Sequence, residues 1–444
     1  MTEKKRCKNT PINYEIVSRE ITNSGIANIG KASIREIKRL IDNIENATGE
    51  KFIRMEMGIP GLPAVKYGID GEIEALKNGV ASLYPEIDGV ETLKTEISRF
   101  AKLFLDLDIN STGCIPTVGS LQGSFASFMT LNRMHPDKDT TLLIDPGFPV
   151  HKQQLQLLGQ KFESFDVYNY RGEKLKEKLE SYFKKGNIHS LLYSNPNNPS
   201  WMCFTHDELK IIGSLATKYD VVVMEDLAYF GMDFRKDYSK PGQPPYQPTA
   251  GKYTDKYILL ISSSKAFSYA GQRIGMLIIS DKLFNYNSKE LSKYYSIENF
   301  GRCILFGTLY PLSGGTSHSA QYGLESILKA VNDGIYNYRD DVIEYGKKSA
   351  IMKKIFTDNG FQIVYDKDID EPVGDGFYFT ISYPGFTGEK LIEEFMYYGI
   401  SAISLSITGS EREGLRACVS LIDRKQFPDL EKRLKIFNEN YPLN

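Results

Sequence analysis

The sequence lacks the features that mark several classes of protein. It has five cysteines with no C-x-x-C pair and five scattered histidines with no H-E-x-x-H motif. A disulfide framework or a cysteine-based zinc site is therefore not expected, and a reducing compartment is favoured. Excess charge is also missing, because 54 lysines and arginines against 56 aspartates and glutamates leave a formal net charge of −2. Such a chain has no overall electrostatic attraction to nucleic acid or to an anionic membrane.

Long hydrophobic runs are missing as well. The longest apolar runs, such as residues 257–261, are far shorter than the roughly 20 residues that a membrane-spanning helix needs. Residues 1–8 are basic, but no apolar segment follows them, so no signal peptide is predicted. We therefore expect a cytoplasmic protein. What is present is a chain of 444 residues with 41% hydrophobic and 25% charged residues, which is typical of a globular protein with more than one domain.

From about residue 118, candidate strands alternate with candidate helices. The predicted strands cover residues 141–145, 190–194, 221–225, 257–263 and 275–280, and the predicted helices cover 119–133, 173–184 and a segment that opens with a capping box at 205–208. This alternation predicts a mostly parallel sheet flanked by helices. In such sheets the ligand lies beyond the carboxyl ends of the strands, so residues that follow the strands are the candidates for a site.

The pattern changes near residue 331, where charged helices separated by short strands begin. We interpret residues 331–444 as a small α+β domain and residues 71–330 as a large α/β domain. Residues 1–70 contain an amphipathic helix predicted over 33–46, with a capping box at its start. We expect this N-terminal segment to pack with the small domain.

The first cluster with chemical potential follows the predicted strand 257–261. It contains Ser262, Ser264, Lys265 and Arg273. Hydroxyl groups and an arginine together suit a phosphate group. A lysine among cationic neighbours can have its pKa lowered and act as an amine nucleophile. The alternative is a polar turn with an exposed lysine.

Three further clusters follow predicted strands or open predicted helices. Asp226 comes directly after the strand 221–225 and suits a helix cap, a metal ligand or the partner of a cationic ring nitrogen. The metal is the weakest of these because no other ligands are spaced nearby. Asn198, in the turn 195–200, is a turn residue or an amide directed at a ligand. Residues 119–123 open a helix whose free N–H groups form an anion site or an ordinary helix start.

In this order and spacing, the four clusters resemble the pyridoxal-phosphate (PLP) enzymes of the aspartate aminotransferase superfamily, the class I and II aminotransferases of fold type I. Five further segments fit the same pattern: 57–61 (Met-Gly-Ile-Pro-Gly), 84–93 (Tyr-Pro, then Gly89 and Leu93), 146–149 (Pro-Gly-Phe-Pro), 375–378 (Asp-Gly-Phe-Tyr) and 414–416 (Gly-Leu-Arg). The resemblance implies an α/β fold with a mostly parallel central sheet flanked by helices, plus a smaller α+β domain.

The resemblance also implies roles for the polar residues. Lys265 would hold PLP as a Schiff base and carry the proton during catalysis. Asp226 would pair with the pyridinium nitrogen, which keeps the ring an electron sink. Asn198 and Tyr229 would hydrogen-bond the phenolic oxygen of the ring, and Phe148 would stack on its face. The phosphate would be held by a set of polar and cationic groups: Ser120, Leu121, Gln122, Ser262, Ser264 and Arg273.

The resemblance assigns three other residues to contacts with the substrate and with the partner subunit. Arg416 would clamp the substrate α-carboxylate with both arms of its guanidinium, assisted by the backbone of Gly58. Tyr84 would reach the phosphate of the neighbouring subunit's cofactor, so that a homodimer would share its active sites. No metal is implied.

The chain departs from the family pattern at three positions. Trp201 stands where the family's Asn-Pro-Thr-Gly turn has glycine, Ser263 replaces the usual apolar or aromatic residue two before the lysine, and Tyr269 replaces an apolar residue. These changes leave the chemical groups intact but indicate an outlying branch. The substrate side chain stays open, with Arg302 and Arg35 as candidates for a second carboxylate contact only by elimination.

The favoured function is a PLP-dependent aminotransferase that moves an amino group between an L-amino acid and a 2-oxo acid by a ping-pong mechanism. A PLP-dependent β-lyase, decarboxylase or racemase is an alternative, because the same cofactor cradle serves all of them. A non-catalytic regulator with this fold is a third possibility, which the intact Lys265 argues against.

Overall fold

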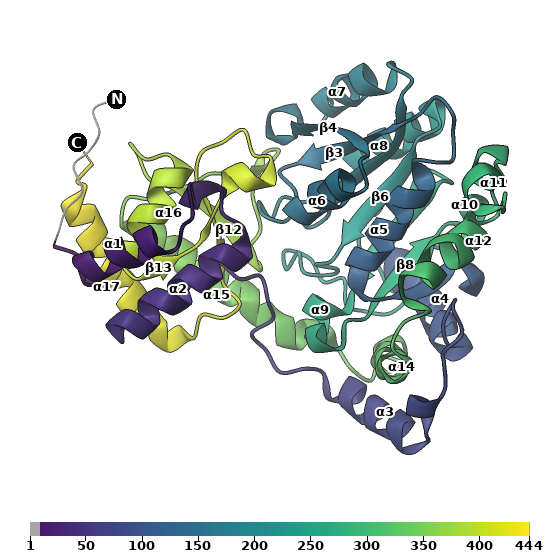
Figure 1. Ribbon diagram of the computed structural model, residues 1–444, viewed down its shortest axis with the longest axis horizontal. Coiled ribbons are helices and arrows are strands. Elements are labelled where there is room, and N and C mark those ends of the chain that lie inside the picture. Colours follow the sequence, from purple (N-terminus) through teal and green to yellow (C-terminus); the bar gives the residue numbers. More distant parts are fainter. Residues whose placement is uncertain (1–8, 444) are drawn as a thin grey trace.

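A seven-stranded sheet organises one half of the computed structural model, which describes residues 9–443 (Figure 1). Its strand order is β2-β8-β7-β6-β5-β3-β4. The strands are β2 (Cys114–Thr117), β3 (Thr140–Asp145), β4 (Lys161–Asp166), β5 (Ile188–Ser194), β6 (Val222–Leu227), β7 (Tyr257–Ser262) and β8 (Gly275–Ile279). Neighbouring strands from β4 to β7 pair in parallel, whereas β8 runs antiparallel to both of its neighbours. The predicted fold class, a mostly parallel sheet within an α/β protein, is confirmed.

Helices cover both faces of this sheet (Figure 1), so its central strands are buried throughout. This burial explains why β6 and β7 are continuously apolar for most of their length. The helices of this half are α3 (Lys66–Lys77), α4 (Glu91–Leu105), α5 (Gly119–Leu131), α6 (Pro149–Leu157), α7 (Lys174–Phe183), α8 (His206–Tyr219), α9 (Ser263–Ala266), α10 (Asp281–Phe284), α11 (Lys289–Tyr295), α12 (Phe300–Arg302), α13 (Tyr310–Ser313) and α14 (His318–Asn332), with a π-helix over Cys303–Leu309.

A four-stranded antiparallel sheet organises the other half, in the order β14-β15-β12-β9. Its strands are β9 (Gln362–Ile363), β12 (Tyr378–Ser382), β14 (Ile403–Ser404) and β15 (Leu415–Cys418), and its helices are α15 (Tyr338–Asp358), α16 (Gly388–Tyr397) and α17 (Phe427–Asn440). Two short hairpin strands, β10 (Lys367–Asp368) and β11 (Glu371–Pro372), pair with each other. Charged helices and short strands alternate here, as the sequence predicted.

The N-terminal segment packs against this second half. Helices α1 (Tyr14–Asn23) and α2 (Ile34–Thr48) contact each other, and β1 (Ile53–Arg54) pairs in parallel with β13 (Ile400–Ser401). Helix α2 opens with the predicted capping box between Ser33 and Glu36. The exact domain boundaries at residues 70 and 330 stay a prediction, and the basic segment 1–8 lies outside the described residues.

Two strands of the large sheet were missing from the sequence prediction, for identifiable reasons. β4 is an edge strand whose residues from Lys161 to Ser164 are exposed or half-buried, so it carries little hydrophobic signal. β2, at the opposite edge, contains Pro116, and proline is tolerated at a sheet edge but argues against a strand in a sequence.

Eight short 3₁₀ turns complete the described part of the chain: Ile29–Lys31, Val80–Ser82, Ser111–Gly113, Tyr168–Tyr170, Ala250–Lys252, Ala270–Gln272, Leu405–Thr408 and Arg424–Gln426.

None of the helices within residues 9–443 combines the length and the apolar composition that crossing a bilayer requires. In the same part of the chain, no group of three or more histidine, cysteine or acidic side chains is arranged to hold a metal ion.

Candidate active site

The edge formed by the carboxyl ends of β5, β6 and β7 brings three of the predicted site residues together. The three strands are neighbours in the sheet. Asn198 follows β5, Asp226 lies at the end of β6, and Lys265 lies in the one-turn helix α9 that follows β7. The strand order therefore places these three polar residues at the same edge of the sheet, which is where the sequence predicted them.

Lys265 is a half-buried amine that has no acidic partner within residues 9–443. Its Nζ donates a hydrogen bond to the carbonyl oxygen of Gly58 and lies 5.3 Å from the ring centre of Phe377. Burial, together with the positive charges of Arg416 and Arg273, lowers the pKa of Lys265 to about 8. An amine of this pKa is partly neutral near pH 7, which makes it a nucleophile.

Asp226 is a buried carboxylate that no lysine or arginine in the described part of the chain pairs with. The Ala228 N–H donates to its Oδ1 at 3.1 Å, and Nε2 of His151 lies 3.7 Å from its Oδ2. Burial raises the pKa of Asp226 to about 7 and lowers the pKa of His151 to about 4, so this histidine is neutral near pH 7. A cationic group beside Asp226 would relieve the cost of burying its charge.

His151 was not among the predicted site residues. It lies in the first turn of α6, and its ring meets the ring of the predicted residue Phe148 edge-on at 5.7 Å. Phe148 therefore lies at the same end of the site as Asp226. The only signal in the sequence was a histidine just after the segment 146–149, which local spacing does not connect to Asp226.

Arg416, on β15, is buried to 1% exposure and reaches the same site from the four-stranded sheet. Its Nη1 donates to Oδ1 of Asn198 at 3.2 Å and its Nη2 to the carbonyl oxygen of Glu56 at 2.7 Å. Its Nε has no hydrogen-bond partner, and no carboxylate in residues 9–443 forms an ion pair with it. A buried guanidinium without a counter-charge is costly, so this position suits an anionic ligand.

Tyr229, the other predicted contact of the ring oxygen, is buried just beyond β6. Its hydroxyl lies 2.7 Å from the hydroxyl of Tyr378 on β12. The ring of Tyr378 lies under the guanidinium of Arg416, whose Cζ is 4.4 Å from the ring centre. A Cβ on Gly58 would overlap the Tyr378 hydroxyl, so Gly58 lies directly against it. Tyr378 belongs to the predicted segment 375–378, but it carried no role in the sequence analysis.

The predicted phosphate residues gather where α5 begins. Gly119 opens the helix with φ +65°, and a Cβ there would lie 2.7 Å from Nη2 of Arg273. The missing side chain therefore lets the guanidinium approach the free N–H groups of the first turn, which is a favourable place for an anion. The first turn contains Ser120, Leu121 and Gln122.

The remaining phosphate candidates have local partners. Oγ of Ser262 accepts from the N–H of Ser264 at 3.1 Å and so caps α9. Oε1 of Gln122 accepts from the N–H of Val118, while its Nε2 donates to Oγ of Ser313, both at 2.8 Å. The amide of Gln122 is thus occupied in holding the start of α5.

Trp201 shows how the chain keeps the family turn without its glycine. The residue adopts φ +64° and is fully buried. Its ring meets the rings of Tyr229 and Tyr378 edge-on at 5.3 and 6.2 Å. A Cβ on Gly376 would overlap the indole, so Gly376 makes room for it. The turn therefore combines a left-handed residue with a large aromatic side chain that packs against the two tyrosines.

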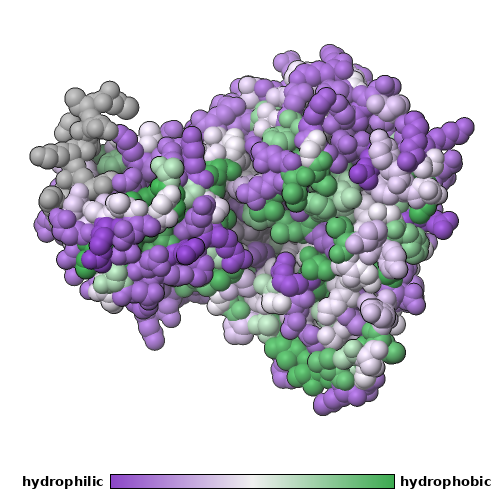
Figure 2. Space-filling view, in the orientation of Figure 1, coloured by the Kyte–Doolittle hydropathy of each residue, from purple (hydrophilic) through white to green (hydrophobic). Residues whose placement is uncertain are grey.

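Tyr84 is separated from this cluster and is 95% exposed. It lies beside a groove of about 430 Å³ between the segment 76–85 and the loop 313–319. Apolar side chains are also exposed on α3, which precedes Tyr84 in the sequence. Figure 2 shows hydrophobic residues gathered over α3 at the lower edge of the molecule. The exposed members on α3 are Tyr67, Ile69, Ile73 and Leu76, and Leu83 is exposed just beyond the helix.

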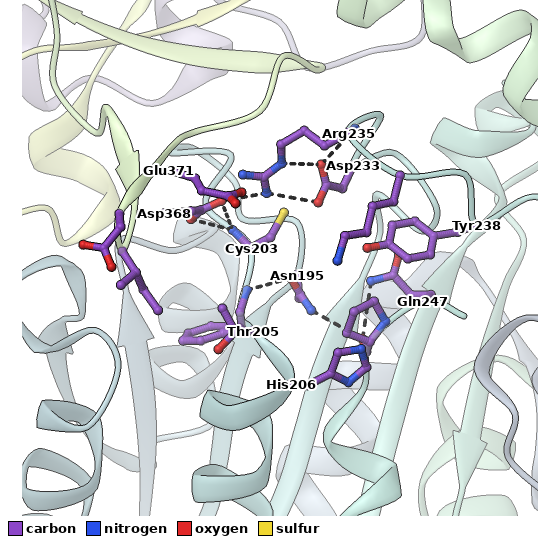
Figure 3. Close-up of a pocket in the computed structure, with 15 residues that line it drawn as sticks. Asn195, Cys203, Thr205, His206, Asp233, Arg235, Tyr238, Gln247, Asp368 and Glu371 are labelled. Atoms are coloured by element: carbon purple, nitrogen blue, oxygen red, sulfur yellow. Dashed lines mark hydrogen bonds and ion pairs between the residues drawn. The ribbon is translucent and has the colours of Figure 1, made fainter. Parts of the chain in front are cut away.

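A cavity of about 380 Å³ lies elsewhere and includes none of the predicted site residues (Figure 3). Its charged wall is internally paired. Asp368 accepts from Arg235 at 2.8 Å, from Arg171 at 3.0 Å and from the N–H of Cys203 at 3.0 Å, while Arg235 also pairs with Asp233. This network ties the β10–β11 hairpin to the half of the molecule around the large sheet.

Comparisons with known proteins agree with this geometry. The family model for aminotransferase class I and II matches residues 52–308, more than half of the chain. A probable aspartate aminotransferase of Methanocaldococcus jannaschii is 28% identical over 353 residues, covering 74% of this chain and 86% of that protein. The glutamate-pyruvate aminotransferase AlaC of Escherichia coli is 26% identical over 311 residues, covering 68% and 69%.

Solved structures share the fold. The aspartate aminotransferase of Thermotoga maritima superimposes with a TM-score of 0.73 at 17% identity and covers 95% of this chain and 99% of its own. The aspartate aminotransferase of Thermus thermophilus with maleate gives a TM-score of 0.72 at 14% identity, covering 95% and 98%.

Proposed function

Because the chain belongs to the class I and II aminotransferase family and is a PLP-dependent aminotransferase, we propose that Lys265 carries the cofactor and that the enzyme works by a ping-pong mechanism. The amino group would pass from an L-amino acid to the cofactor and then to a 2-oxo acid. The substrates are of these two classes, and the clamp at Arg416 supports an α-carboxylate in both.

One observation supports this assignment above the others: three ionisable groups in the site, two buried and one half-buried, lack partners of opposite sign in the described chain. They are the amine of Lys265, the carboxylate of Asp226 and the guanidinium of Arg416. The chemistry of PLP and its substrate suits each of them. The aldehyde suits the amine, the ring cation suits the carboxylate, and a substrate carboxylate suits the guanidinium. The N-terminus of α5 with Arg273 suits the phosphate.

When bound, the cofactor supplies an electron sink for the bonds at the substrate α-carbon. Asp226 would hold the ring nitrogen in its protonated form, and neutral His151 would support that carboxylate. Arg416 would fix the substrate carboxylate and so orient the α-carbon bonds. The amine of Lys265, with its pKa lowered to about 8, would take the proton from the α-carbon and return it to a neighbouring atom.

We further propose a cytoplasmic homodimer with shared active sites. Tyr84, almost wholly exposed in the single chain, would reach the cofactor phosphate of the partner subunit. The apolar side chains exposed on α3 and the groove beside Tyr84 would be covered in the dimer. A reducing cytoplasm suits the free cysteines at positions 114, 203, 303 and 418.

The first experiment is the visible spectrum of the purified protein with PLP, before and after adding a pool of amino acids without any oxo acid. We expect a visible cofactor band that converts to the spectrum of pyridoxamine phosphate, because only half of the reaction can occur. Splitting the pool then identifies the amino donor. A band that persists while ammonia, pyruvate or CO₂ is released would contradict transamination.

The covalent role of Lys265 is tested by borohydride reduction followed by mass spectrometry. The wild-type peptide that contains Lys265 should gain the mass of the reduced cofactor, and the Lys265→Ala variant should not. Covalent PLP in the variant would show that another lysine is the attachment point.

A further inference from the structure

Tyr378 occupies a central position that the proposed roles leave unused. Its hydroxyl lies 2.7 Å from the hydroxyl of Tyr229 and directly against the backbone of Gly58. The side chain is 1% exposed, so this hydroxyl has no bulk water to bond with. The Tyr229–Tyr378 pair is therefore a defined hydrogen bond between two elements 149 residues apart.

The packing around the pair holds both rings in place. Arg416 covers the face of the Tyr378 ring at 4.4 Å, and Trp201 meets both tyrosine rings edge-on. Phe377 contacts the ring of Tyr229 at 5.5 Å. Neither hydroxyl can move far without disturbing these contacts.

The direction of the hydrogen bond follows from the charges nearby. A tyrosine hydroxyl has one proton to donate and can also accept. Burial raises the pKa of both hydroxyls and Arg416 counteracts it at both, but the guanidinium lies directly over the ring of Tyr378, which makes Tyr378 the better donor. Cys418 also acts on both hydroxyls, and the amine of Lys265 lies over the neighbouring Phe377 ring.

If Tyr378 donates to Tyr229, the single proton of Tyr229 is left to bond elsewhere. Under the proposed function, that partner is the phenolic oxygen of the cofactor. A hydroxyl that accepts one hydrogen bond becomes a stronger donor in the next, because the two bonds polarise each other. The opposite direction would turn the Tyr229 proton away from the cofactor.

We propose that Tyr378 is a positioning residue whose hydroxyl donates to Tyr229 and thereby directs and strengthens the hydrogen bond from Tyr229 to the phenolic oxygen of PLP. This inference rests on the proposed cofactor contacts of Lys265 and Tyr229. It adds a residue of the four-stranded sheet to the electronic control of the cofactor, beyond its general part in packing.

The proposal predicts a spectroscopic effect. The phenolic oxygen carries uncompensated negative charge once the linkage between PLP and Lys265 has lost its proton, so donors to that oxygen favour the deprotonated form. Removing a donor should therefore raise the pH midpoint at which the visible band of the PLP-loaded enzyme changes. Loss of Tyr229 removes a direct bond to a charged oxygen, whereas loss of Tyr378 only weakens it.

The experiment is a pH titration of that band in the PLP-loaded enzyme without substrate. Tyr229→Phe should raise the midpoint by about one pH unit or more, and Tyr378→Phe by a few tenths of a unit. The double variant should match Tyr229→Phe alone, because Tyr378 acts through Tyr229. Phenylalanine keeps each ring in its packing, so each variant removes only an oxygen atom.

Tyr383→Phe is the matched control. Tyr383 is also 1% exposed and follows β12, but its hydroxyl lies between two acceptors away from the site, Oδ1 of Asn438 at 2.6 Å and the carbonyl oxygen of Tyr441 at 2.7 Å. Its midpoint should equal that of the wild type.

The possible failures can be told apart. An unchanged midpoint in Tyr378→Phe, or a further shift when Tyr378→Phe is added to Tyr229→Phe, would overturn the relay while leaving the proposed function intact. An unchanged midpoint in Tyr229→Phe would overturn the relay and the placement of Tyr229 together. A wild-type protein that forms no visible band with PLP would overturn the proposed function itself.

Discussion

At the scale of single residues, neighbouring carboxylates on one strand take different positions. Glu225 and Asp226 are consecutive on β6, and burial raises the pKa of each to about 7. Alternation along a strand sends them to opposite faces of the sheet. Oε2 of Glu225 accepts from the hydroxyl of Thr249 at 2.5 Å and the N–H of Ala250 at 3.3 Å, whereas Asp226 faces the site. Both groups are buried, but only Asp226 has the cofactor as a prospective counter-charge.

Glu225→Gln should change the pH dependence of stability. Because the pKa of Glu225 rises from an ordinary 4.5 to about 7 on folding, the folded state binds the extra proton between these values. The contribution of Glu225 to stability therefore falls as pH rises from 4.5 to 7, at about 1.4 kcal/mol per pH unit, and the variant lacks this loss. Urea unfolding of the PLP-loaded protein at pH 5 and pH 8 measures the difference.

A second buried glutamate supplies the control for this measurement. Although burial acts to raise it, hydrogen bonds from Arg171 hold the pKa of Glu208 below its ordinary value. Stability due to Glu208 is lost only as pH falls below about 4.5. The difference in unfolding free energy between the wild type and Glu208→Gln should therefore be the same at pH 5 and pH 8. If the difference between the wild type and Glu225→Gln were also the same at the two pH values, Glu225 would be ionised in the folded protein.

Arg416→Lys should raise KM for the amino acid by about tenfold or more, since a charged hydrogen bond contributes about 1.5–3 kcal/mol. Lysine has one ammonium group instead of the planar fork of arginine. It therefore cannot bond Asn198, the Glu56 carbonyl and a substrate carboxylate at the same time. Steady-state kinetics measure this effect. Arg433→Lys is the control, because Arg433 is also buried and also donates to backbone carbonyls, those of Gly399 and Lys51. An unchanged KM in Arg416→Lys would place the carboxylate clamp elsewhere.

At the scale of single elements, the loop between β5 and α8 combines backbone strain with aromatic packing. Trp201 holds φ +64°, a conformation that costs a bulky residue about 1–3 kcal/mol. The contacts of its buried indole with Tyr229 and Tyr378 offset this conformational cost. The loop therefore positions Tyr229 by packing, where the family pattern has a small residue.

Trp201→Gly should destabilise the protein by about 2–3 kcal/mol. Emptying the site of a buried tryptophan costs about 3–5 kcal/mol, and relief of the left-handed strain returns part of that. Thermal unfolding of the PLP-loaded enzyme measures the change. Ser296→Gly is the control, because Ser296 also has a positive φ, +55°, but lies exposed at the end of α11. It should be neutral or slightly stabilising, and a gain in stability for Trp201→Gly would contradict the packing argument.

At the scale of the whole molecule, the site joins both halves of the chain. Lys265 and Asp226 come from the seven-stranded sheet, whereas Arg416 and Tyr378 come from the four-stranded sheet. The network of Asp368 with Arg171 and Arg235 ties the two halves together at a separate place. The exposed Tyr84 extends the same principle to a second subunit in the proposed dimer.

The shared active site is tested by mixing two impaired variants. Lys265→Ala removes the proposed nucleophile, and Tyr84→Phe removes the proposed contact to the partner's phosphate. In a hybrid dimer, one of the two sites would combine an intact Lys265 with an intact Tyr84. After unfolding and refolding of an equal mixture, we expect about a quarter of the wild-type activity, since half of the dimers are hybrids with one complete site each. Activity equal to the mean of the two separate variants would contradict a shared site.

Local sequence determined much of this architecture. Continuous apolar strands, capping boxes and polar residues after strand ends respond to short-range physics, so they located the central strands, several longer helices such as α2, α5, α8 and α15, and the candidates Lys265, Asp226 and Asn198. The order of the motifs was sufficient to indicate the family, which the comparisons confirmed. Edge strands such as β4 escaped prediction because they bury too little to show a pattern.

Only the tertiary structure decided which distant residues meet. The contacts of Asp226 with His151, of Tyr229 with Tyr378 and of Arg416 with Asn198 join residues 75, 149 and 218 positions apart. No local periodicity encodes such pairs, because they depend on which strands become neighbours and on how the two sheets pack. The sequence by itself thus indicated which side chains carry the chemistry. The fold decided which partners each of these side chains contacts.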